Sequence, residues 1–230
     1  MKTIGILGGM GPEATLLLYR LIIDHTDAKS DQEHIPTLIY SNTRVPDRTR
    51  AILHQGEDPL PYLIQSAKVL REGGADIIGM PCNTAHHYFD RLTEEVEGDY
   101  VNMVELTYRR ILNNDSRKKI VLFATAGTIE TGIYDFSLRN KGIQVLSPKP
   151  KDQEVIMKMI YGQIKSGKRP IDLEEYQELL YRMEEEGFEA VILGCTELSY
   201  LHSMFKFPVN IEFINTLDLL AAELVKKAKQ

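Results

Sequence analysis

The chain has no tryptophan, only two cysteines and no long apolar run among its 230 residues. A membrane-spanning helix needs about 20 consecutive apolar residues, and no stretch approaches that length. A signal peptide is not predicted either, because glycines and a proline at positions 8 to 12 interrupt the short apolar run at the N-terminus. We therefore expect no membrane partner and a cytoplasmic location.

Basic residues are too few for a nucleic-acid partner. Lysine and arginine together number 27 against 33 aspartates and glutamates, which gives a formal net charge of −6, and they form no cluster. A nucleic-acid surface needs a basic patch that neutralises phosphates. The hydrophobic content of 43% and the charged content of 26% are instead typical of a globular protein with a sizeable core.

Metal-binding patterns are also missing. The six histidines lack ligand spacing, and no two cysteines are separated by two residues. No metal site is predicted. Composition leaves open a disulfide between Cys82 and Cys195, but thiols in the cytoplasm are normally kept reduced.

What the chain does contain is a repeat built around these two cysteines. Residues 75–80 are predicted to form a buried strand that ends in a turn before Cys82, and residues 190–193 repeat that strand before Cys195. The cysteines are 113 residues apart (195 minus 82), and Gly74 and Gly187 show the same separation. A chain that places both of its thiols at matching points of a repeated unit is expected to use them together.

Short apolar strands alternate with amphipathic helices along the whole chain. The predicted strands cover residues 3–7, 37–41, 75–80, 100–103, 119–124, 143–146, 190–193 and 210–214. The predicted helices cover residues 13–25, 51–54, 60–72, 85–95, 105–112, 134–141, 153–165, 173–186 and 218–227. This alternation is typical of parallel sheets that helices cover on both faces.

The repeat predicts two similar α/β domains, each a parallel sheet flanked by helices. A pseudo-twofold axis is expected to relate them, with the active site between them. The polar cluster at residues 113–116 is the predicted boundary. The first domain then comprises residues 1–114 with a returning segment, 209–230, and the second comprises residues 115–208.

The turn at residues 9–14 matches the G-x-G-x-x-A fingerprint of dinucleotide-binding domains. Those domains place an acidic residue at the end of the second strand to hold the ribose, whereas residues 37–41 lead here into Asn42-Thr43-Arg44. Two interpretations stay open for this turn. It binds an anionic ligand at a helix N-terminus, or it is a tight turn with no ligand.

Two cysteines at the N-termini of helices can act as an acid and a base. The positive end of a helix dipole lowers a thiol pKa from its ordinary value of about 8.5. Two thiols facing one amino acid from opposite sides could remove the Cα proton on one face and return a proton to the other, which inverts the stereocentre. Backbone N–H groups of Asn83, Thr84 and Thr196 and the threonine hydroxyls are expected to stabilise the developing negative charge. The alternative is that both cysteines are inert buried residues.

Five stretches carry a resemblance to a known family. They are ILGGMGP at 6–12, PDRT at 46–49, MPCNTAH at 80–86, ATAGT at 124–128 and GCTE at 194–197. In these stretches, which span nearly the whole chain, the sequence resembles the aspartate/glutamate racemase superfamily. It is most similar to the aspartate racemases that need no cofactor.

The resemblance implies two α/β domains around a shared site, usually in a dimer. It places Cys82 and Cys195 on the two acid/base cysteines, and it implies no cofactor. The substrate-binding residues that it implies are Met10, Arg48, Asn83, Thr84, Ala85, Thr125, Lys165 and Thr196. Of these, Arg48 and Lys165 are expected to hold the carboxylates of the substrate.

One departure from the family pattern lies near the C-terminus. Many relatives carry Asp-Thr and a histidine where this chain has Asn215-Thr216 and Leu220. The leading hypothesis is nevertheless an aspartate racemase that interconverts L- and D-aspartate as a homodimer, without pyridoxal phosphate. The alternatives are a glutamate or broad-specificity racemase of the same superfamily, and a non-catalytic nucleotide-binding module that uses the turn at residues 9–14.

Overall fold

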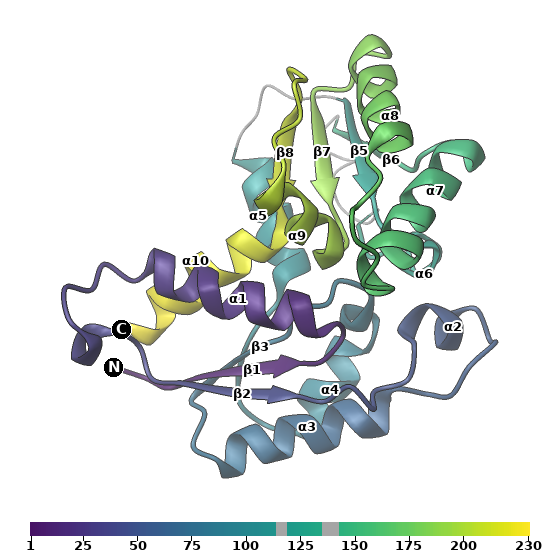
Figure 1. The fold of residues 1–230 in the computed structure, drawn as a ribbon. Helices are drawn as coiled ribbons and strands as arrows, with labels where there is room; N and C mark the ends of the chain where they lie inside the picture. Colours follow the sequence, from purple (N-terminus) through teal and green to yellow (C-terminus); the bar gives the residue numbers. More distant parts are fainter. Residues whose placement is uncertain (114–118, 135–142) are drawn as a thin grey trace.

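The computed structural model describes residues 1–113, 119–134 and 143–230, which form two parallel sheets (Figure 1). The first has the strand order β2-β1-β3-β4, and the second has the order β6-β5-β7-β8. The strands are β1 (Ile4–Gly8), β2 (Thr37–Ser41), β3 (Ile77–Gly79), β4 (Asp99–Val101), β5 (Lys119–Phe123), β6 (Gln144–Leu146), β7 (Ala190–Leu193) and β8 (Glu212–Asn215). The predicted α/β class with two similar domains is confirmed.

The two sheets repeat one arrangement. In each, the first strand of the half lies between the second and the third, and all pairings are parallel. Strands β3 and β7, which precede the two cysteines, therefore occupy equivalent interior positions. Parallel strands end at a common edge, so each cysteine lies at the carboxyl edge of its sheet, where α/β proteins bind ligands.

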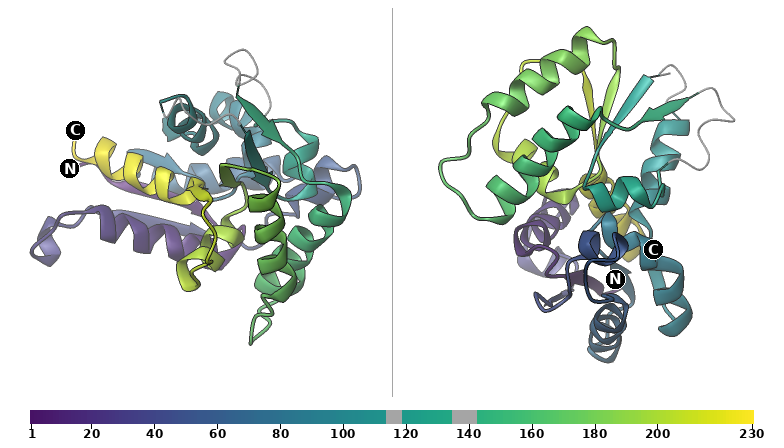
Figure 2. Two further views of the ribbon diagram at one scale, coloured as in Figure 1. Left: turned by 90° about the horizontal axis from the view of Figure 1, so that it is seen from above. Right: turned by 90° about the vertical axis from the view of Figure 1, so that its right-hand side faces the viewer.

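Helices cover both faces of each sheet (Figures 1 and 2). They are α1 (Pro12–His25), α2 (Arg48–Ile52), α3 (Leu60–Glu72), α4 (Phe89–Glu95), α5 (Met103–Leu112), α6 (Ala126–Glu130), α7 (Pro150–Met157), α8 (Glu174–Glu185), α9 (Thr196–Met204) and α10 (Thr216–Ala228). Short 3-10 helices form at η1 (Asp31–Glu33) and η2 (Thr84–Tyr88), and a π-helix forms at η4 (Lys158–Lys165).

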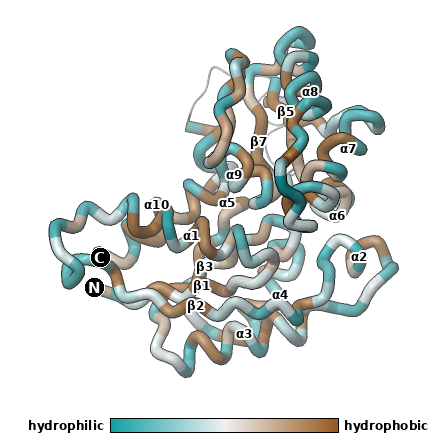
Figure 3. The backbone as a smooth tube through the Cα atoms, in the orientation of Figure 1, coloured by the Kyte–Doolittle hydropathy of each residue, from teal (hydrophilic) through white to brown (hydrophobic). Residues whose placement is uncertain are grey.

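Burial explains the apolar strands. All five residues of β1 and all four of β7 are buried, whereas the edge strand β2 is only partly covered. Figure 3 shows the corresponding hydrophobic residues running through the interior strands of both sheets. A strand with one face in solvent alternates apolar and polar residues. Because helices cover both faces of these strands, their sequences are near-continuous apolar runs.

Several helices differ from their predicted bounds, and the helix predicted at 85–95 is the 3-10 helix η2 followed by α4. The short helix predicted at 51–54 begins at Arg48, because Asp47 caps it by accepting a hydrogen bond from the Arg50 N–H at 2.8 Å. The single helix predicted at 153–165 is instead α7 followed by the π-helix η4. Most of the helix predicted at 134–141 and most of the boundary predicted at 113–116 lie outside the described residues.

The last helix of each half packs on the other half. Helix α10 follows β8 but buries Leu217, Leu220 and Leu224 against the first sheet. Helix α5 follows β4, and Ile111 near its end belongs to a cluster with the second sheet. This reciprocal exchange ties the two domains together around the expected pseudo-twofold axis.

The returning segment starts later than the sequence analysis placed it. Strand β8 pairs with β7 in the second sheet, although residues 209–230 were assigned to the first domain. Only α10 crosses back, and its end meets the N-terminus, where the Lys2 N–H donates to the Ala228 carbonyl at 2.9 Å. We therefore propose that the return begins at Thr216. None of the described helices is long and apolar enough to cross a membrane.

The packing of α10 on the first sheet leads to a prediction about stability. Leu224 is fully buried, and a Cβ added at Gly79 of β3 would come within 2.6 Å of its Cδ1, so the side chain lies directly on the strand. Leu224→Ala should lower the free energy of unfolding by about 2–5 kcal/mol through lost burial and a cavity. Urea denaturation measures the loss, and the control Val69→Ala, at a 40% exposed position, should change stability by less than about 0.5 kcal/mol. Equal effects of the two substitutions would contradict this packing.

Candidate active site

Both cysteines line one cavity between the two domains. Cys82 follows β3, Cys195 follows β7, both are free thiols, and each is only 5% exposed. The cavity is lined by Met10, Arg48, Thr49, Cys82, Asn83, Thr84, Thr125, Tyr161, Lys165, Cys195, Thr196 and Glu197. Its open volume is about 10 Å³, which is roughly the room that one water molecule needs.

The cavity brings together nearly all of the residues singled out in the sequence. Both cysteines line it, and so do seven of the residues predicted to bind substrate: Met10, Arg48, Asn83, Thr84, Thr125, Lys165 and Thr196. Ala85 does not, because its side chain is fully buried in the apolar cluster of the first domain.

Three lining residues were missed. Thr49 follows Arg48 directly, and Glu197 stands in the GCTE stretch, from which only Cys195 and Thr196 were predicted as site residues. Tyr161 lies four residues before Lys165 on η4, a spacing that puts both on one face of the helix. Its hydroxyl donates to Asp47 Oδ2 of the first domain at 3.1 Å.

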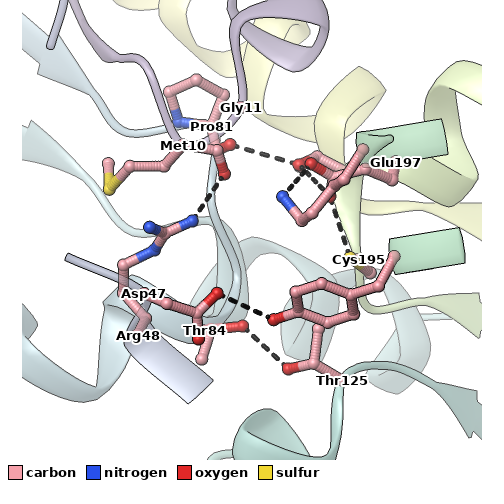
Figure 4. Close-up of polar contacts among 12 residues, drawn as sticks. Met10, Gly11, Asp47, Arg48, Pro81, Thr84, Thr125, Cys195 and Glu197 are labelled. Carbon is pink, nitrogen blue, oxygen red and sulfur yellow. Dashed lines mark hydrogen bonds and ion pairs between the residues drawn. The ribbon is translucent and has the colours of Figure 1, made fainter. Parts of the chain in front are cut away.

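Cys195 occupies the N-cap position of helix α9, but its side chain makes no capping hydrogen bond to the helix. Its Sγ–H donates to Glu197 Oε2 at 3.0 Å, and Glu197 Oε1 accepts a hydrogen bond from Lys165 Nζ (Figure 4). Burial, and then the negative charge of Glu197, raise the pKa of the Cys195 thiol well above its ordinary value, and Lys165 offsets this only in part. The expectation of a lowered Cys195 pKa is therefore wrong, because burial and Glu197 act in the opposite direction.

Cys82 is held through its backbone. It precedes the 3-10 helix η2, and its carbonyl accepts a hydrogen bond from His86 Nδ1 at 2.8 Å. The other ring nitrogen, Nε2, accepts from the Met103 N–H at 3.2 Å. The neutral imidazole thus pins the turn that carries Cys82, and burial lowers the pKa of His86 to about 4.

Arg48 brings a buried positive charge to the cavity. Its Nη1 donates to the carbonyls of Val45 and Pro46, and its Nη2 donates to Met10 O at 3.2 Å. Its Nε is buried and has no hydrogen-bond partner among the described residues. Burial works against the charge, but the attraction of Cys82 and Asp47 outweighs it and raises the pKa of Arg48. Because guanidinium has five N–H donors, Arg48 keeps donors for an anionic ligand.

Three threonine hydroxyls join the domains beside the cavity. Thr84 Oγ1, from the first domain, lies 3.0 Å from Thr125 Oγ1 and 2.8 Å from Thr128 Oγ1, both of the second domain. Thr196 Oγ1 crosses in the other direction and donates to Pro81 O at 3.3 Å. These contacts fix the two cysteine turns relative to each other, and Figure 4 shows the one between Thr84 and Thr125.

Asn83 is fixed by groups from the second half of the chain. Its Nδ2 donates to Thr216 Oγ1 at 3.1 Å, and its Oδ1 accepts from the Tyr134 hydroxyl. The departure noted near the C-terminus has a structural explanation here. Asn215 caps α10 by accepting from the N–H groups of residues 217 and 218, and Leu220 is a core residue.

A second, larger cavity of about 360 Å³ adjoins the first. The turn at residues 9–13 lines it together with Thr43, Val45, Asp47 and Ile164, and it shares Met10, Arg48, Lys165 and Glu197 with the inner cavity. The Gly9 N–H in this turn already donates to Thr15 Oγ1 at 2.8 Å, so it is not free to bind a phosphate. Within the described part of the chain no group of histidine, cysteine or acidic side chains is placed to hold a metal ion.

The chain is similar in sequence and structure to several racemases. The sequence profile of the family described as Asp/Glu/Hydantoin racemase matches residues 7–224. The structure of Picrophilus torridus aspartate racemase is similar, with a TM-score of 0.83 and 32% identity over 100% of this chain and 95% of that one. Broad specificity amino-acid racemase RacX of Bacillus subtilis is 29% identical over 215 residues, 90% of this chain and 91% of RacX. Glutamate racemase of Aquifex pyrophilus is 26% identical over 166 residues, 71% of this chain and 63% of the relative.

Two buried histidines predict how stability depends on pH. Burial lowers the pKa of both His86 and His202 to about 4, below the value near 6.5 of an unfolded histidine. Between these values the unfolded chain binds protons that the folded chain does not, so the free energy of unfolding falls as pH drops from 6.5 to 4. Each histidine should contribute about 3 kcal/mol to this loss.

Urea denaturation at a series of pH values measures the effect. His86→Asn should flatten the dependence by about half and lower stability at pH 7, since Asn cannot bridge Cys82 and Met103 in the same way. The control His54→Asn, at an exposed position, should keep the full dependence. An unchanged slope in His86→Asn would contradict the assignment.

Proposed function

The chain belongs to the Asp/Glu/Hydantoin racemase family, and from that premise we propose that it interconverts L- and D-aspartate without a cofactor. In this proposal Cys82 and Cys195 are the two acid/base groups. The observation that carries it is the convergence of both cysteines, from equivalent ends of two repeated strands, on one cavity. A site with equivalent halves suits a reaction whose substrate and product are mirror images.

The proposed reaction moves two protons. One cysteine, as thiolate, takes the Cα proton of the bound amino acid, and the electron pair is left on the substrate as a carbanion. The other cysteine, as thiol, delivers its proton to the opposite face. The first cysteine ends as a thiol and the second as a thiolate, so charge and protons balance.

Helix N-termini beside both cysteines support charge stabilisation. Thr84 opens η2 and Thr196 opens α9, and the first N–H groups of a helix have no carbonyl of a preceding turn to bind. They can point at a carboxylate whose charge grows as the Cα proton leaves.

Arg48 and Lys165 support a substrate with two carboxylates. They belong to different domains, both line the inner cavity, and both also line the outer one. Arg48 keeps an unpaired Nε, and Lys165 is already paired with a carboxylate, that of Glu197. A dicarboxylic amino acid that enters from the outer cavity can take over both cations. The inner cavity is too small for it as it stands, so binding requires side chains or domains to move.

A second candidate is a racemase of glutamate or of several amino acids. The name of the Bacillus subtilis relative supports it, and the flexible Lys165 side chain could reach carboxylates at more than one distance. The nucleotide-binding alternative has less support, because the Gly9 N–H is taken by Thr15. The family resemblance also leads us to propose a cytoplasmic homodimer.

Proton exchange with solvent tests the proposed reaction. L-aspartate incubated with the protein in D₂O should lose optical rotation and gain deuterium at Cα. Chiral chromatography and mass spectrometry measure the two changes. A panel of L-amino acids run alongside decides between aspartate, glutamate and broad specificity, and constant rotation with every one of them would end the proposal.

The cysteines are tested one at a time. Cys82→Ala and Cys195→Ala should each lower kcat for racemisation by about 10²- to 10⁴-fold, the usual contribution of a general acid or base. Ser203→Ala, at an exposed position on α9, is the control and should keep full activity. Undiminished racemisation in either cysteine variant would rule out the two-base assignment.

A substitution at Lys165 tests whether this residue binds the second carboxylate of the substrate. Lys165→Gln removes the charge but keeps a similar length, and kcat/KM for aspartate should fall about 10- to 100-fold, as expected for a lost charge-assisted hydrogen bond. Any turnover of alanine, which has no second carboxylate, should fall much less. Lys158→Gln, at the exposed start of the same π-helix, is the matched control. Equal losses for aspartate and alanine would mean that Lys165 does not select the side chain.

A further inference from the structure

Glu197 is the only carboxylate among the described residues that line the inner cavity. Its residue is 4% exposed, so it lies in a medium of low dielectric. Its two oxygens have different partners. Oε2 accepts a hydrogen bond from the Cys195 thiol at 3.0 Å, and Oε1 is ion-paired with Lys165 Nζ.

This arrangement favours the neutral form of Cys195. A carboxylate beside a buried thiol accepts a hydrogen bond from S–H but repels the thiolate. Burial and Glu197 act in the same direction on the pKa of Cys195, and both raise it. Lys165 would stabilise a thiolate at this position, but Glu197 occupies its ammonium group.

Cys82 has the opposite surroundings. Arg48 lines the same cavity, and its guanidinium is stabilised by the charge of Cys82. Arg48 Nε is buried with no hydrogen-bond partner in the described part of the chain, which leaves a donor for a negatively charged group. The two cysteines are equivalent in the repeat but not in their electrostatics.

We propose that Glu197 is a positioning residue that keeps the proton on Cys195, so that Cys195 is the acid of the pair in the free protein and Cys82 takes the other role. The catalytic meaning of this assignment rests on the proposed racemase function. In one turnover Cys82 gains the substrate proton and Cys195 gives its own proton to the product. Cys195 is then a thiolate beside the Glu197 carboxylate, and this repulsion drives its reprotonation by solvent water as Cys82 releases its proton.

Thiol alkylation tests the proposal without any substrate. The rate of reaction of each cysteine with iodoacetamide is measured from pH 6 to 10 by peptide mass spectrometry. The midpoint of each rate profile gives the apparent pKa of that thiol. In Glu197→Gln the midpoint of Cys195 should move down by one pH unit or more. At pH 8 this corresponds to a rate about tenfold higher. The rate at Cys82 should change by less than about twofold.

Three further variants make the result specific. Glu197→Asp keeps the charge and should leave the Cys195 midpoint within half a pH unit of its value in the unaltered protein. Lys165→Met removes the cation and should move the Cys195 midpoint up, opposite to Glu197→Gln. Glu175→Gln also breaks a lysine–glutamate pair, with Lys158 at 2.8 Å on the surface of the same domain, and should change neither cysteine.

The outcomes separate this inference from the proposed function. A lowered Cys195 midpoint in Glu197→Gln supports the role of Glu197 even if no amino acid is racemised. An unchanged or raised midpoint overturns it, even if racemisation is robust. If Glu197→Gln does not fold, Lys165→Met decides, because a Cys195 midpoint that stays or falls there is equally incompatible with the proposal. Where racemisation is found, the alkaline limb of its kcat/KM profile should move to lower pH in Glu197→Gln.

Discussion

The meeting of two carboxyl-terminal sheet edges is the constraint on which the rest of the structure depends. Each sheet alone ends in a turn with one cysteine, and neither turn encloses a site. The hydroxyl cluster of Thr84, Thr125 and Thr128 and the contact from Thr196 to Pro81 hold the two edges together. The exchange of α5 and α10 between the halves adds an apolar connection behind this contact. The cavity exists because these polar and apolar contacts act on both sides of it.

Duplication explains the shape of the site, but side chains make its halves unequal. The repeat puts a thiol on each side of the cavity. What differs is that the Cys195 thiol donates to the Glu197 carboxylate, whereas the charge of Cys82 interacts with the Arg48 guanidinium. A symmetric scaffold with two identical thiols would have no preferred proton donor at rest. The Glu197 carboxylate makes Cys195 the preferred proton donor. Its own buried negative charge is offset by Lys165.

Much of this could be predicted from the sequence, and the rest depends on contacts between distant residues. Near-continuous apolar strands and a constant spacing of 113 residues (195 minus 82) were enough for the α/β class and the two domains. The start of the returning segment was misplaced because residues 209–214 carry no signal that says which sheet they join; pairing with β7 decides it. The predicted direction of the Cys195 pKa shift was wrong, because the helix dipole was considered without burial and without Glu197. Tyr161 was missed because it reaches the site from a π-helix, which a periodic apolar pattern does not distinguish from an α-helix.

The Lys165–Glu197 pair also bears on how a substrate is selected. Both residues line the outer and the inner cavity, so an entering molecule meets the pair before it reaches the cysteines. A second carboxylate can replace Glu197 on the Lys165 ammonium, which exchanges one charge-assisted pair for another of the same kind. An amino acid with a neutral side chain offers no such replacement. It would leave Lys165 bound to Glu197 or would break the pair and leave a buried charge uncompensated. The proposed selection for a dicarboxylate therefore depends on the resting contacts of Lys165.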